Sequence, residues 1–548
     1  METTNLLDKN KMIVNRIQIV WNVVNTALIL IVMIMAIVAV SRTKTTHYTQ
    51  ATISLPTNEL LKQGDIVSIA QDGKLQKGAG ISIYRNTNRF ATSDKIKHLH
   101  SIYMGNGVTV LCYYSTYAIL LPGKLDSETL KIKWQKPVSL ESKQMTCDAM
   151  ERLGNSTNVV IIGGNKAMPV TVNEHDSLIT FQLGQVTQHT QGFSIDPRIA
   201  VLSNKHVAIS FYHTENENTT LNAAVFELEN SNENAILVIK SKEIYSLNHA
   251  SHQIMKFSES EFVLCHPLDD IPTVESGPLS CILATFKYNT IQFSAPVTLD
   301  GVKLNFFFDM ALLSPNRGVV VFTDTAIDNG IKGVVLELLT TKSGEKRLDF
   351  GSTIIINSGH GGGKLPSNLW VYINVEVVSQ DRFIAVYSDL SNEGRITCLL
   401  VEVSNSASLN LISPEFVISP PNPNFSQYYW IDVSIVDQSM FMIFDSLSEQ
   451  NGGVVAIGEM KSSVLGIVVF GDKNSAVVQM EGRVSVPNAH LTVGRTYFTT
   501  SRGRMHEGAF YGDISELDPE NYLKVGSTVI SDSSRIGVAV SSSELLLK

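Results

Sequence analysis

The stretch that decides the fold is Phe383-Ile384-Ala385-Val386-Tyr387-Ser388-Asp389, an apolar run that ends in an aromatic residue and a polar turn. Runs of this composition are typical of a buried β-strand. The pattern recurs at 207–213, 319–324 and 441–445, and looser versions end at Tyr114, Gly164 and Cys265. With anchors at positions 114, 164, 212, 265, 322, 387 and 444, the intervals are 50, 48, 53, 57, 65 and 57 residues. The spacing predicts a sevenfold repeat.

Each repeat contains signals for four strands. Fifteen residues after four of the anchors, a glutamate stands inside a further apolar run, at Glu227, Glu337, Glu402 and Glu459. Turn formers such as Asp328-Asn329-Gly330 separate the two runs and predict a hairpin. An earlier strand end precedes each anchor, as in Val378-Ser379, and a fourth signature follows, as in Phe350-Gly351 and Phe470-Gly471.

Repeats of roughly 40–60 residues with four antiparallel strands are the sequence form of a β-propeller. We therefore predict an all-β fold with a seven-bladed β-propeller of four-stranded blades over residues 92–485. An array of β-sandwiches or a β-solenoid is the alternative that the scatter of the intervals leaves open.

The N-terminal region predicts a membrane anchor. Residues 17–41 contain no charge, and residues 19–40 are mostly Ile, Val, Leu, Met and Ala. As a helix these 22 residues reach about 33 Å, enough for a hydrocarbon core of roughly 30 Å. We predict a cytoplasmic tail at 1–18, a transmembrane signal anchor at 19–40 that contacts membrane lipid, and type II topology. A cleaved signal peptide is the alternative, although its apolar region is usually shorter.

The composition limits the classes of partner and the number of disulfides that we expect. The chain of 548 residues has a formal net charge of −9, which argues against nucleic acid as a partner. Its five cysteines are too few for a disulfide scaffold, and an odd number leaves at least one thiol unpaired within the chain. Cys112, Cys265 and Cys398 lie in apolar runs typical of buried core residues, and a Cys265–Cys281 bridge within one blade is the alternative.

The regions on either side of the repeats predict one small β-module. After a linker at 41–63, residues 64–91 contain a hairpin with the turn Asp72-Gly73, and residues 486–548 contain further strand-like runs. The C-terminal run opens with Leu491-Thr492-Val493-Gly494-Arg495-Thr496-Tyr497-Phe498 and ends with Ile536-Gly537-Val538-Ala539-Val540-Ser541-Ser542-Ser543-Glu544-Leu545-Leu546-Leu547. These motifs resemble the small β-module of phage tail-fibre-like proteins. The resemblance implies that the propeller is inserted into a module formed by both flanks, and that the protein acts in attachment.

A type II anchor that carries a propeller head is also similar in architecture to the attachment glycoproteins of enveloped paramyxoviruses. The likeness is not one of motifs, because this chain has neither their many cysteines nor their Asn-Arg-Lys-Ser-Cys-Ser run.

No motif predicts catalysis, a cofactor or a metal site. The loop Gly359-His360-Gly361-Gly362-Gly363-Lys364 lacks the flanking residues of a phosphate loop, and we interpret it as a connection between blades. The pairs His98/His100 and His249/His252 have no further identifiable ligand and are interpreted as surface pairs. We expect a non-enzyme.

The polar residues that follow the anchor strands are the candidate ligand-binding residues, because they should emerge on one face of the propeller. They are His213, Asp324, Asp389 and Asp445. Acidic side chains repeated on one face could bind a cation or a sugar, and the alternative is that they cap turns. Sequons at Asn155, Asn218 and Asn424 predict glycosylation of an external head.

The sequence thus predicts a membrane-anchored protein on a cell surface or virion envelope that recognises or attaches to a glycan or protein receptor. One alternative is a sialidase-like glycoside hydrolase of the propeller class, which would need clustered arginines and paired carboxylates at the centre. Another is a structural coat or spike component. The head could also form a homo-oligomer.

Overall fold

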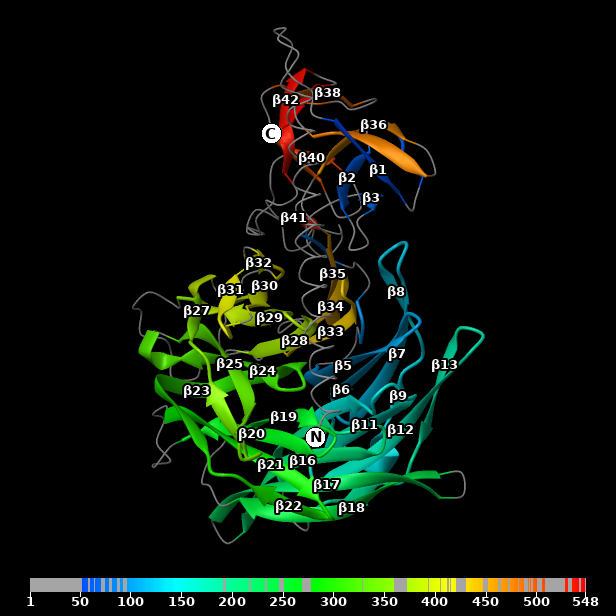
Figure 1. Ribbon diagram of the computed structural model, residues 1–548. Coiled ribbons are helices and arrows are strands. Elements are labelled where there is room, and N and C mark those ends of the chain that lie inside the picture. The colour runs from blue at the N-terminus through cyan, green and yellow to red at the C-terminus, as the bar shows by residue number, and fades with distance from the viewer. Residues whose placement is uncertain are drawn as a thin grey trace, which may run out of the picture. The chain divides into compact units, whose positions relative to one another are not determined.

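The computed structural model describes residues 52–547 with gaps (Figure 1). The gaps are 58–59, 64, 70–73, 78–80, 86–88, 92–95, 191–193, 216–217, 232–233, 246–250, 269–276, 328, 359–371, 393, 405, 412, 414, 420–429, 447–451, 462–464, 472–473, 481, 487–490, 492, 494–495, 500–504, 508–527, 531–534 and 542–543. The predicted anchor at 19–40 therefore lies outside the described residues. Among those residues no helix has the length and apolar character needed to cross a membrane.

The chain divides into two compact units. The ring unit contains Gly80–Lys461 and Ala509–Ser533, and the flanking unit contains Met1–Ala79, Ser462–Gly508 and Ser534–Lys548. The described residues are almost entirely β-strand, with three one-turn 3-10 helices at Glu141–Lys143, Thr325–Ile327 and Leu390–Asn392.

The ring unit consists of successive antiparallel meanders, each followed along the chain by the next. The first contains β5 (Lys97–Gly105), β6 (Val108–Tyr114), β7 (Ala118–Asp126), β8 (Lys131–Trp134) and the short β9 (Val138–Ser139). The second contains β10 (Ala149–Arg152), β11 (Asn158–Gly163), β12 (Lys166–His175), β13 (Leu178–Leu183) and β14 (Thr187–Gln188). The third contains β15 (Ser194–Val201), β16 (His206–Glu215), β17 (Asn218–Ser231) and β18 (Asn234–Tyr245).

The fourth and fifth meanders share one sheet because a single long strand, β23 (Val297–Ser314), pairs with both. The fourth contains β19 (Gln253–Ser258), β20 (Glu261–Pro267), β21 (Gly277–Lys287) and β22 (Thr290–Phe293). The fifth continues from β23 through β24 (Arg317–Asp324), β25 (Gly330–Thr340), β26 (Lys346–Phe350) and β27 (Ile354–Asn357). The sixth contains β28 (Ile373–Ser379), β29 (Arg382–Asp389), β30 (Arg395–Val403), β31 (Leu409–Leu411) and β32 (Phe416–Val417).

The last meander is completed by a strand from the other end of the unit. Its first three strands are β33 (Ile431–Asp437), β34 (Met440–Ser446) and β35 (Gly453–Met460), and β35 pairs with β4 (Ile81–Arg85), which precedes the first meander. β4 in turn pairs with β41 (Thr528–Ile530). The sequence analysis instead assigned Phe470-Gly471 to the fourth strand of this repeat, and that assignment is wrong. Phe470 lies in β36 (Gly466–Gly471) of the flanking unit, an apolar strand that pairs with β37 (Ser475–Gln479).

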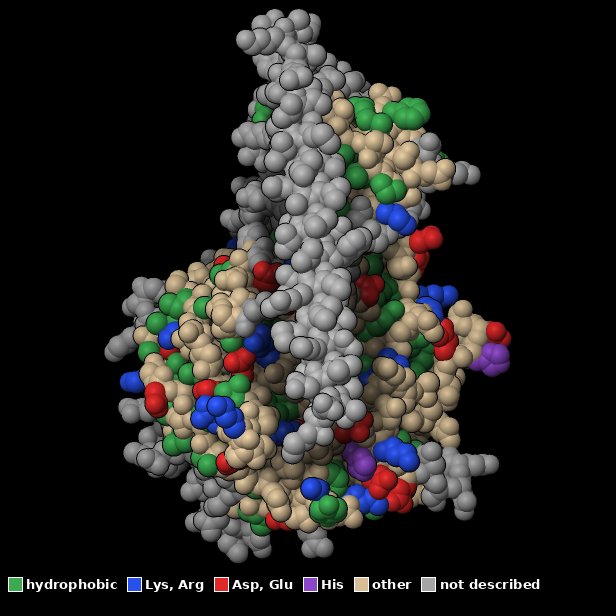
Figure 2. All heavy atoms as spheres, viewed as in Figure 1, with side chains coloured by type: hydrophobic (Ala, Val, Ile, Leu, Met, Phe, Trp, Pro, Cys, Tyr) green, Lys and Arg blue, Asp and Glu red, His purple; other side chains and the backbone are tan. Residues whose placement is uncertain are grey.

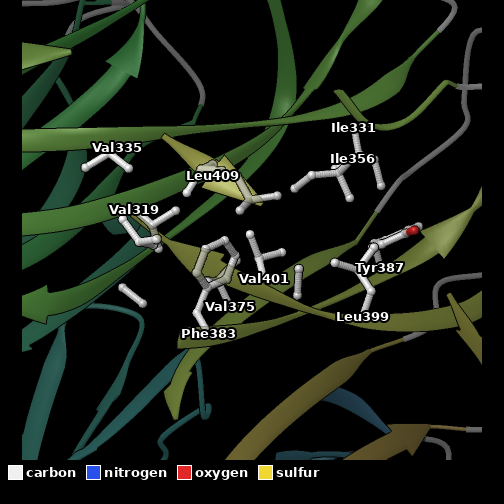
Figure 3. Close-up of a cluster of buried hydrophobic side chains, with 14 of the residues drawn as sticks. Val319, Ile331, Val335, Ile356, Val375, Phe383, Tyr387, Leu399, Val401 and Leu409 are labelled. Atoms are coloured by element: carbon white, nitrogen blue, oxygen red, sulfur yellow. The ribbon is translucent and has the colours of Figure 1, made fainter. Parts of the chain in front are cut away.

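The meanders are arranged as a closed ring, which makes the fold propeller-like. The first strands are neighbours in the order β5, β10, β15, β19, β23, β28, β33 and again β5. Apolar clusters fill the space between consecutive meanders. Figure 3 shows the cluster between the fifth and sixth, where Val319 and Val335 pack with Phe383 and Val401. A further cluster joins the first meander to the last, with Leu111 and Phe444 among its members.

The predicted repeat signals correspond to the second and third strands. The anchor runs are β6, β11, β16, β20, β24, β29 and β34. The repeated glutamates lie on the third strands, and three of them pair with a basic side chain of the same meander: Glu337 with Arg317 at 2.7 Å, Glu402 with Arg382 at 3.2 Å and Glu227 with Lys240 at 2.9 Å. These pairs are structural contacts within a sheet.

The structure changes the interpretation of the cysteines. Cys265 and Cys281 face each other across β20 and β21 and form a disulfide, as the alternative reading proposed. Cys112, interpreted as a plain core residue, is bonded to Cys147 in the connection between the first and second meanders, and no spacing signal links these two positions. Cys398 is a buried free thiol, and burial raises its pKa.

The flanking unit combines both ends of the chain in two sheets. One has the order β1 (Thr52–Pro56), β37 (Ser475–Gln479), β36 (Gly466–Gly471), β2 (Ile66–Ile69), β3 (Leu75–Lys77). The other has the order β38 (Gly482–Ser485), β43 (Glu544–Leu547), β42 (Arg535–Ser541), β39 (Thr496–Thr499), β40 (Met505–Glu507). Ile66 and Ile467 of the first sheet pack with Val484 and Leu545 of the second. β1 lies within the segment assigned above to the linker 41–63, and β36 and β37 lie within the segment assigned to the propeller.

We predict that Ile83→Ala in β4 destabilises the whole ring unit. Ile83 is fully buried in the cluster between the sixth and last meanders. Loss of such a side chain should lower the free energy of unfolding by about 2–5 kcal/mol. Ile355→Ala, at a position 53% exposed, is the matched control and should change it by less than about 0.5 kcal/mol. Urea unfolding of both variants measures the difference, and equal effects would mean that β4 does not close the ring.

Candidate functional site

Every first strand of the ring unit carries a charged or titratable side chain. We call this set the axial cluster, and it consists of His98 and His100 on β5, Glu151 on β10, Arg198 on β15, Lys256 on β19, Asp309 on β23, Glu376 on β28 and Asp432 on β33. Because the first strands are neighbours in a closed ring, these residues gather around its centre. Their charges act on one another: the pKa of Glu376 is raised by Glu151, Asp432 and Asp309 in addition to burial.

Two carboxylates of the axial cluster connect the first strands of neighbouring meanders. Asp309 Oδ2 accepts a hydrogen bond from the backbone N–H of Val375 on β28, at 2.8 Å. Asp432 Oδ2 accepts hydrogen bonds from both the backbone N–H and the hydroxyl of Ser101 on β5. Asp432 Oδ1 accepts a hydrogen bond from Asn374 Nδ2 at 3.2 Å. Both carboxylates therefore have a structural role in the ring.

The surrounding strands remove bulk water from these acids and raise their pKa values. Desolvation raises the pKa of Asp432 to about 8 and that of Asp309 to about 6, although hydrogen bonds to each carboxylate oppose the shift. Glu151 retains an exposed surface, yet the protein around it raises its pKa to about 7, with Lys256 opposing the shift. Perturbed acids of this kind concentrate at functional sites, and structural networks also produce them.

Aromatic rings on or next to four neighbouring first strands form a second feature. His98 stacks on Trp430 with ring centroids 4.3 Å apart, Trp430 contacts Tyr372 at 5.1 Å, and Tyr372 contacts Phe307 at 5.6 Å. We call these four residues the aromatic arc. Trp430 and Tyr372 immediately precede β33 and β28, and all four rings are partly exposed.

The aromatic arc and the predicted ligand-binding residues belong to the same face of the ring unit. All first strands begin at one face, which we call the entry face, and the antiparallel second strands end there. Accordingly His213 is paired with Ser194 at the start of β15, Asp445 with Ile431 at the start of β33, and Asp324 with Leu304.

The three predicted acids are buried, and two of them cap turns. Asp324 is fully buried, accepts a hydrogen bond from the N–H of Ala326 at 2.9 Å and pairs with Lys332 at 2.6 Å. Asp389 accepts hydrogen bonds from the N–H and hydroxyl of Ser391. Asp445 is 3% exposed. The turn-cap alternative describes the geometry of Asp324 and Asp389.

His213 and the sequons have different positions. His213 is partly buried, with Nδ1 3.3 Å from Thr190 Oγ1. Asn155 is exposed in the turn between β10 and β11, and Asn218 begins β17. Asn424 and the loop 359–364 lie outside the described residues.

The interpretation of the two histidine pairs as surface pairs is wrong for His252, whereas His98 is partly exposed and His249 lies outside the described residues. His252 is fully buried, and its ring lies 4.7 Å from that of Tyr212. His98 and His100 belong to the axial cluster. Within the described residues, no group of three His, Cys, Asp or Glu side chains could hold a metal ion.

Sequence reasoning missed the axial cluster and the aromatic arc. The anchor strands stand out because they are continuously apolar, whereas the first strands mix charged and apolar residues and are interrupted by register shifts, as between Ile195 and Arg198. The available signal was a charged residue shortly before each anchor strand. On the surface visible in Figure 2, the charges of the ring unit are of mixed sign and form no single-sign patch.

Comparisons with known proteins identify no family. No family model matches the chain, and no curated protein matches it. Among solved structures, a protein of unknown function from Dyadobacter fermentans matches with TM-score 0.38 and 12% identity, over 70% of this chain and 99% of the other. The C-terminal WD40 domain of Sif2 matches with TM-score 0.35 and 11% identity, over 67% and 97%. A hypothetical selenium-binding protein from Sulfolobus tokodaii matches with TM-score 0.42 and 9% identity, over 73% and 93%. At these scores the description of the fold rests on the strand pairing alone.

We predict that stability falls as the pH rises from about 6.5 to 8. In this range the folded acids with raised pKa values hold protons that an unfolded chain has already released. His100, His189 and His252 have pKa values lowered by burial, to about 3, 4 and 4, and they reduce stability only at lower pH, where the unfolded chain takes up protons.

Urea unfolding at several pH values measures this slope. The double variant Glu376→Gln/Asp432→Asn should flatten it, whereas Glu345→Gln, at an exposed turn, should leave it unchanged. A stability that is constant or rises over the range would contradict the assignment of protonated acids at the centre.

Proposed function

We propose that this chain is a single-pass type II membrane protein whose external head recognises a surface glycan through the aromatic arc of its entry face. The observation that carries the proposal is the row of partly exposed rings on or next to four neighbouring first strands. A protein receptor is the other class of partner that such a face suits. The head belongs on a cell surface or a virion envelope, with the flanking unit between it and the anchor along the chain.

The head of this proposal is a seven-bladed β-propeller. Its support is the cyclic order of the first strands and the apolar cluster between each pair of consecutive meanders, including the last and the first. In such a ring the entry face is a natural binding surface because loops and strand ends from every blade meet there.

Two features support an external head. The disulfides Cys112–Cys147 and Cys265–Cys281 persist in oxidising compartments and are rare in the cytosol. The exposed turn at Asn155 is accessible to glycosylation. The apolar segment 19–40 supports the anchor.

The chemistry of the entry face suits a sugar. Aromatic rings supply large, rigid, amphipathic contact area, and a sugar presents an apolar C–H face to such a ring. Ligand sites typically combine aromatic side chains with a few polar groups that fix orientation. Here Asn374 lies on β28 two residues after Tyr372, and Asp432 lies on β33 two residues after Trp430.

A glycoside hydrolase is the second candidate, and the axial cluster favours it. Glycosidases use two carboxyl groups, one of which is kept protonated near neutral pH by its surroundings. Glu151 has a raised pKa of about 7 and an exposed surface. Hydrolysis of a glycoside by the native chain would favour this candidate over non-catalytic recognition.

The test is a glycan array probed with the full chain in detergent, together with fluorogenic glycosides. We expect saturable binding without turnover. Trp430→Ala should weaken that binding about 2- to 10-fold, since an aromatic contact contributes about 0.5–1.5 kcal/mol.

Tyr288→Ala is the matched control, because Tyr288 is an 87% exposed aromatic residue in the turn after a third strand, away from the entry face. Equal binding by the native chain and Trp430→Ala would contradict a role of the aromatic arc. Absence of binding to every glycan would favour a protein receptor or a structural coat.

A further inference from the structure

Three strands that carry rings of the aromatic arc are tied together by one side chain. Asp432 follows Trp430 by two residues on β33, and it accepts hydrogen bonds from Ser101 on β5 and from Asn374 on β28. Ser101 follows His98 by three residues, and Asn374 follows Tyr372 by two. The donors therefore come from β5 and β28, and the acceptor comes from β33.

We propose that Asp432 is the positioning residue of the aromatic arc. It holds β5, β28 and β33 in the register that stacks His98 on Trp430 and sets Tyr372 beside them. The importance of this role for recognition rests on the proposed function, whereas the role itself concerns the geometry of the unliganded protein.

The physical reason is that the donors have a single shared acceptor. Asp432 is 8% exposed, so little water is available to accept hydrogen bonds from these donors if the carboxylate is removed. A buried donor without an acceptor lowers the free energy of unfolding. The Ser101 hydroxyl is also 2.7 Å from the Ser434 hydroxyl, which extends the contact along β33. The backbone N–H of Ser101 makes the strand register itself depend on the contact.

The neighbouring amide predicts which substitutions are tolerated. Asn374 Oδ1 is buried and has no hydrogen-bond partner among the described residues. If Asn replaces Asp432, its Oδ1 can still accept from Ser101, and its NH₂ group can donate to Asn374 Oδ1 once the Asn374 amide rotates. Asp432→Asn should therefore keep the geometry, and Asp432→Leu, which has a similar size and no acceptor, should not.

The experiment records near-ultraviolet circular dichroism of the full chain in detergent. The difference between the native chain and Trp430→Phe isolates the signal of Trp430 in its stack. The same difference is measured in the Asp432→Asn and Asp432→Leu backgrounds. Asp437→Leu is the matched control, because Asp437 lies at the other, exposed end of β33 and caps a turn through Ser439.

We expect the Trp430 signal to persist in Asp432→Asn and Asp437→Leu and to lose most of its intensity in Asp432→Leu. Persistence of the full signal in Asp432→Leu would overturn the proposal, as would its loss in a folded Asp432→Asn. If Asp432→Leu does not fold, Ser101→Ala replaces it and should reduce the signal, and an undiminished signal would again overturn the proposal.

The spectra need no ligand, so they separate this inference from the proposed function. If Trp430→Ala leaves glycan binding intact while the spectra behave as expected, the proposed function fails and the positioning role stands. If Trp430→Ala abolishes binding and Asp432→Leu keeps the Trp430 signal, only the positioning role fails.

Discussion

The packing of the last meander against the first is the constraint on which the rest of the ring unit depends. Each sheet has two apolar faces, and neither can be covered by the sheet itself, so every meander needs two neighbours. Phe444 packs in one cluster with Leu111 and thereby covers the two faces that a linear array would leave exposed. β4 adds Ile83 to the cluster on one side of the last meander and packs Tyr84 against the cluster on the other.

Closure also determines the chemistry at the centre. Because the first strands are neighbours in a closed ring, side chains that face its centre lose part of their contact with bulk water. Burial is the largest cause of the raised pKa values of Asp309, Asp432 and Glu151, and neighbouring carboxylates add to it at Asp432 and Glu151. Hydrogen bonds between neighbouring first strands offset part of the cost of burying Asp309 and Asp432.

The sequence predicts the strands that are apolar throughout and misses those whose role depends on a distant partner. The second strands can be predicted from the sequence because both of their faces are buried and therefore apolar, as at Phe383 and Val386. The strand that completes the last meander cannot be identified from the sequence, because Ile81–Arg85 pairs with residues some 370 positions later in the chain. The run ending at Phe470 has the right composition for that position, and only the pairing with β37 shows that it belongs elsewhere.

The candidate site illustrates the same limit. Repeat position places Asp324 and Asp445 at the ends of second strands, but composition alone does not distinguish a buried carboxylate from an exposed ligand-binding one. Trp430 and Tyr372 carry no repeat signal, because their proximity arises from the ring and not from local spacing.

The closed ring is most directly tested by cryo-electron microscopy of the full chain in detergent. We expect the reconstruction of the ring unit to show seven four-stranded sheets around one axis, with the density of β4 beside β35. An open array, a different number of sheets, or a last sheet completed by residues 466–471 would contradict the account.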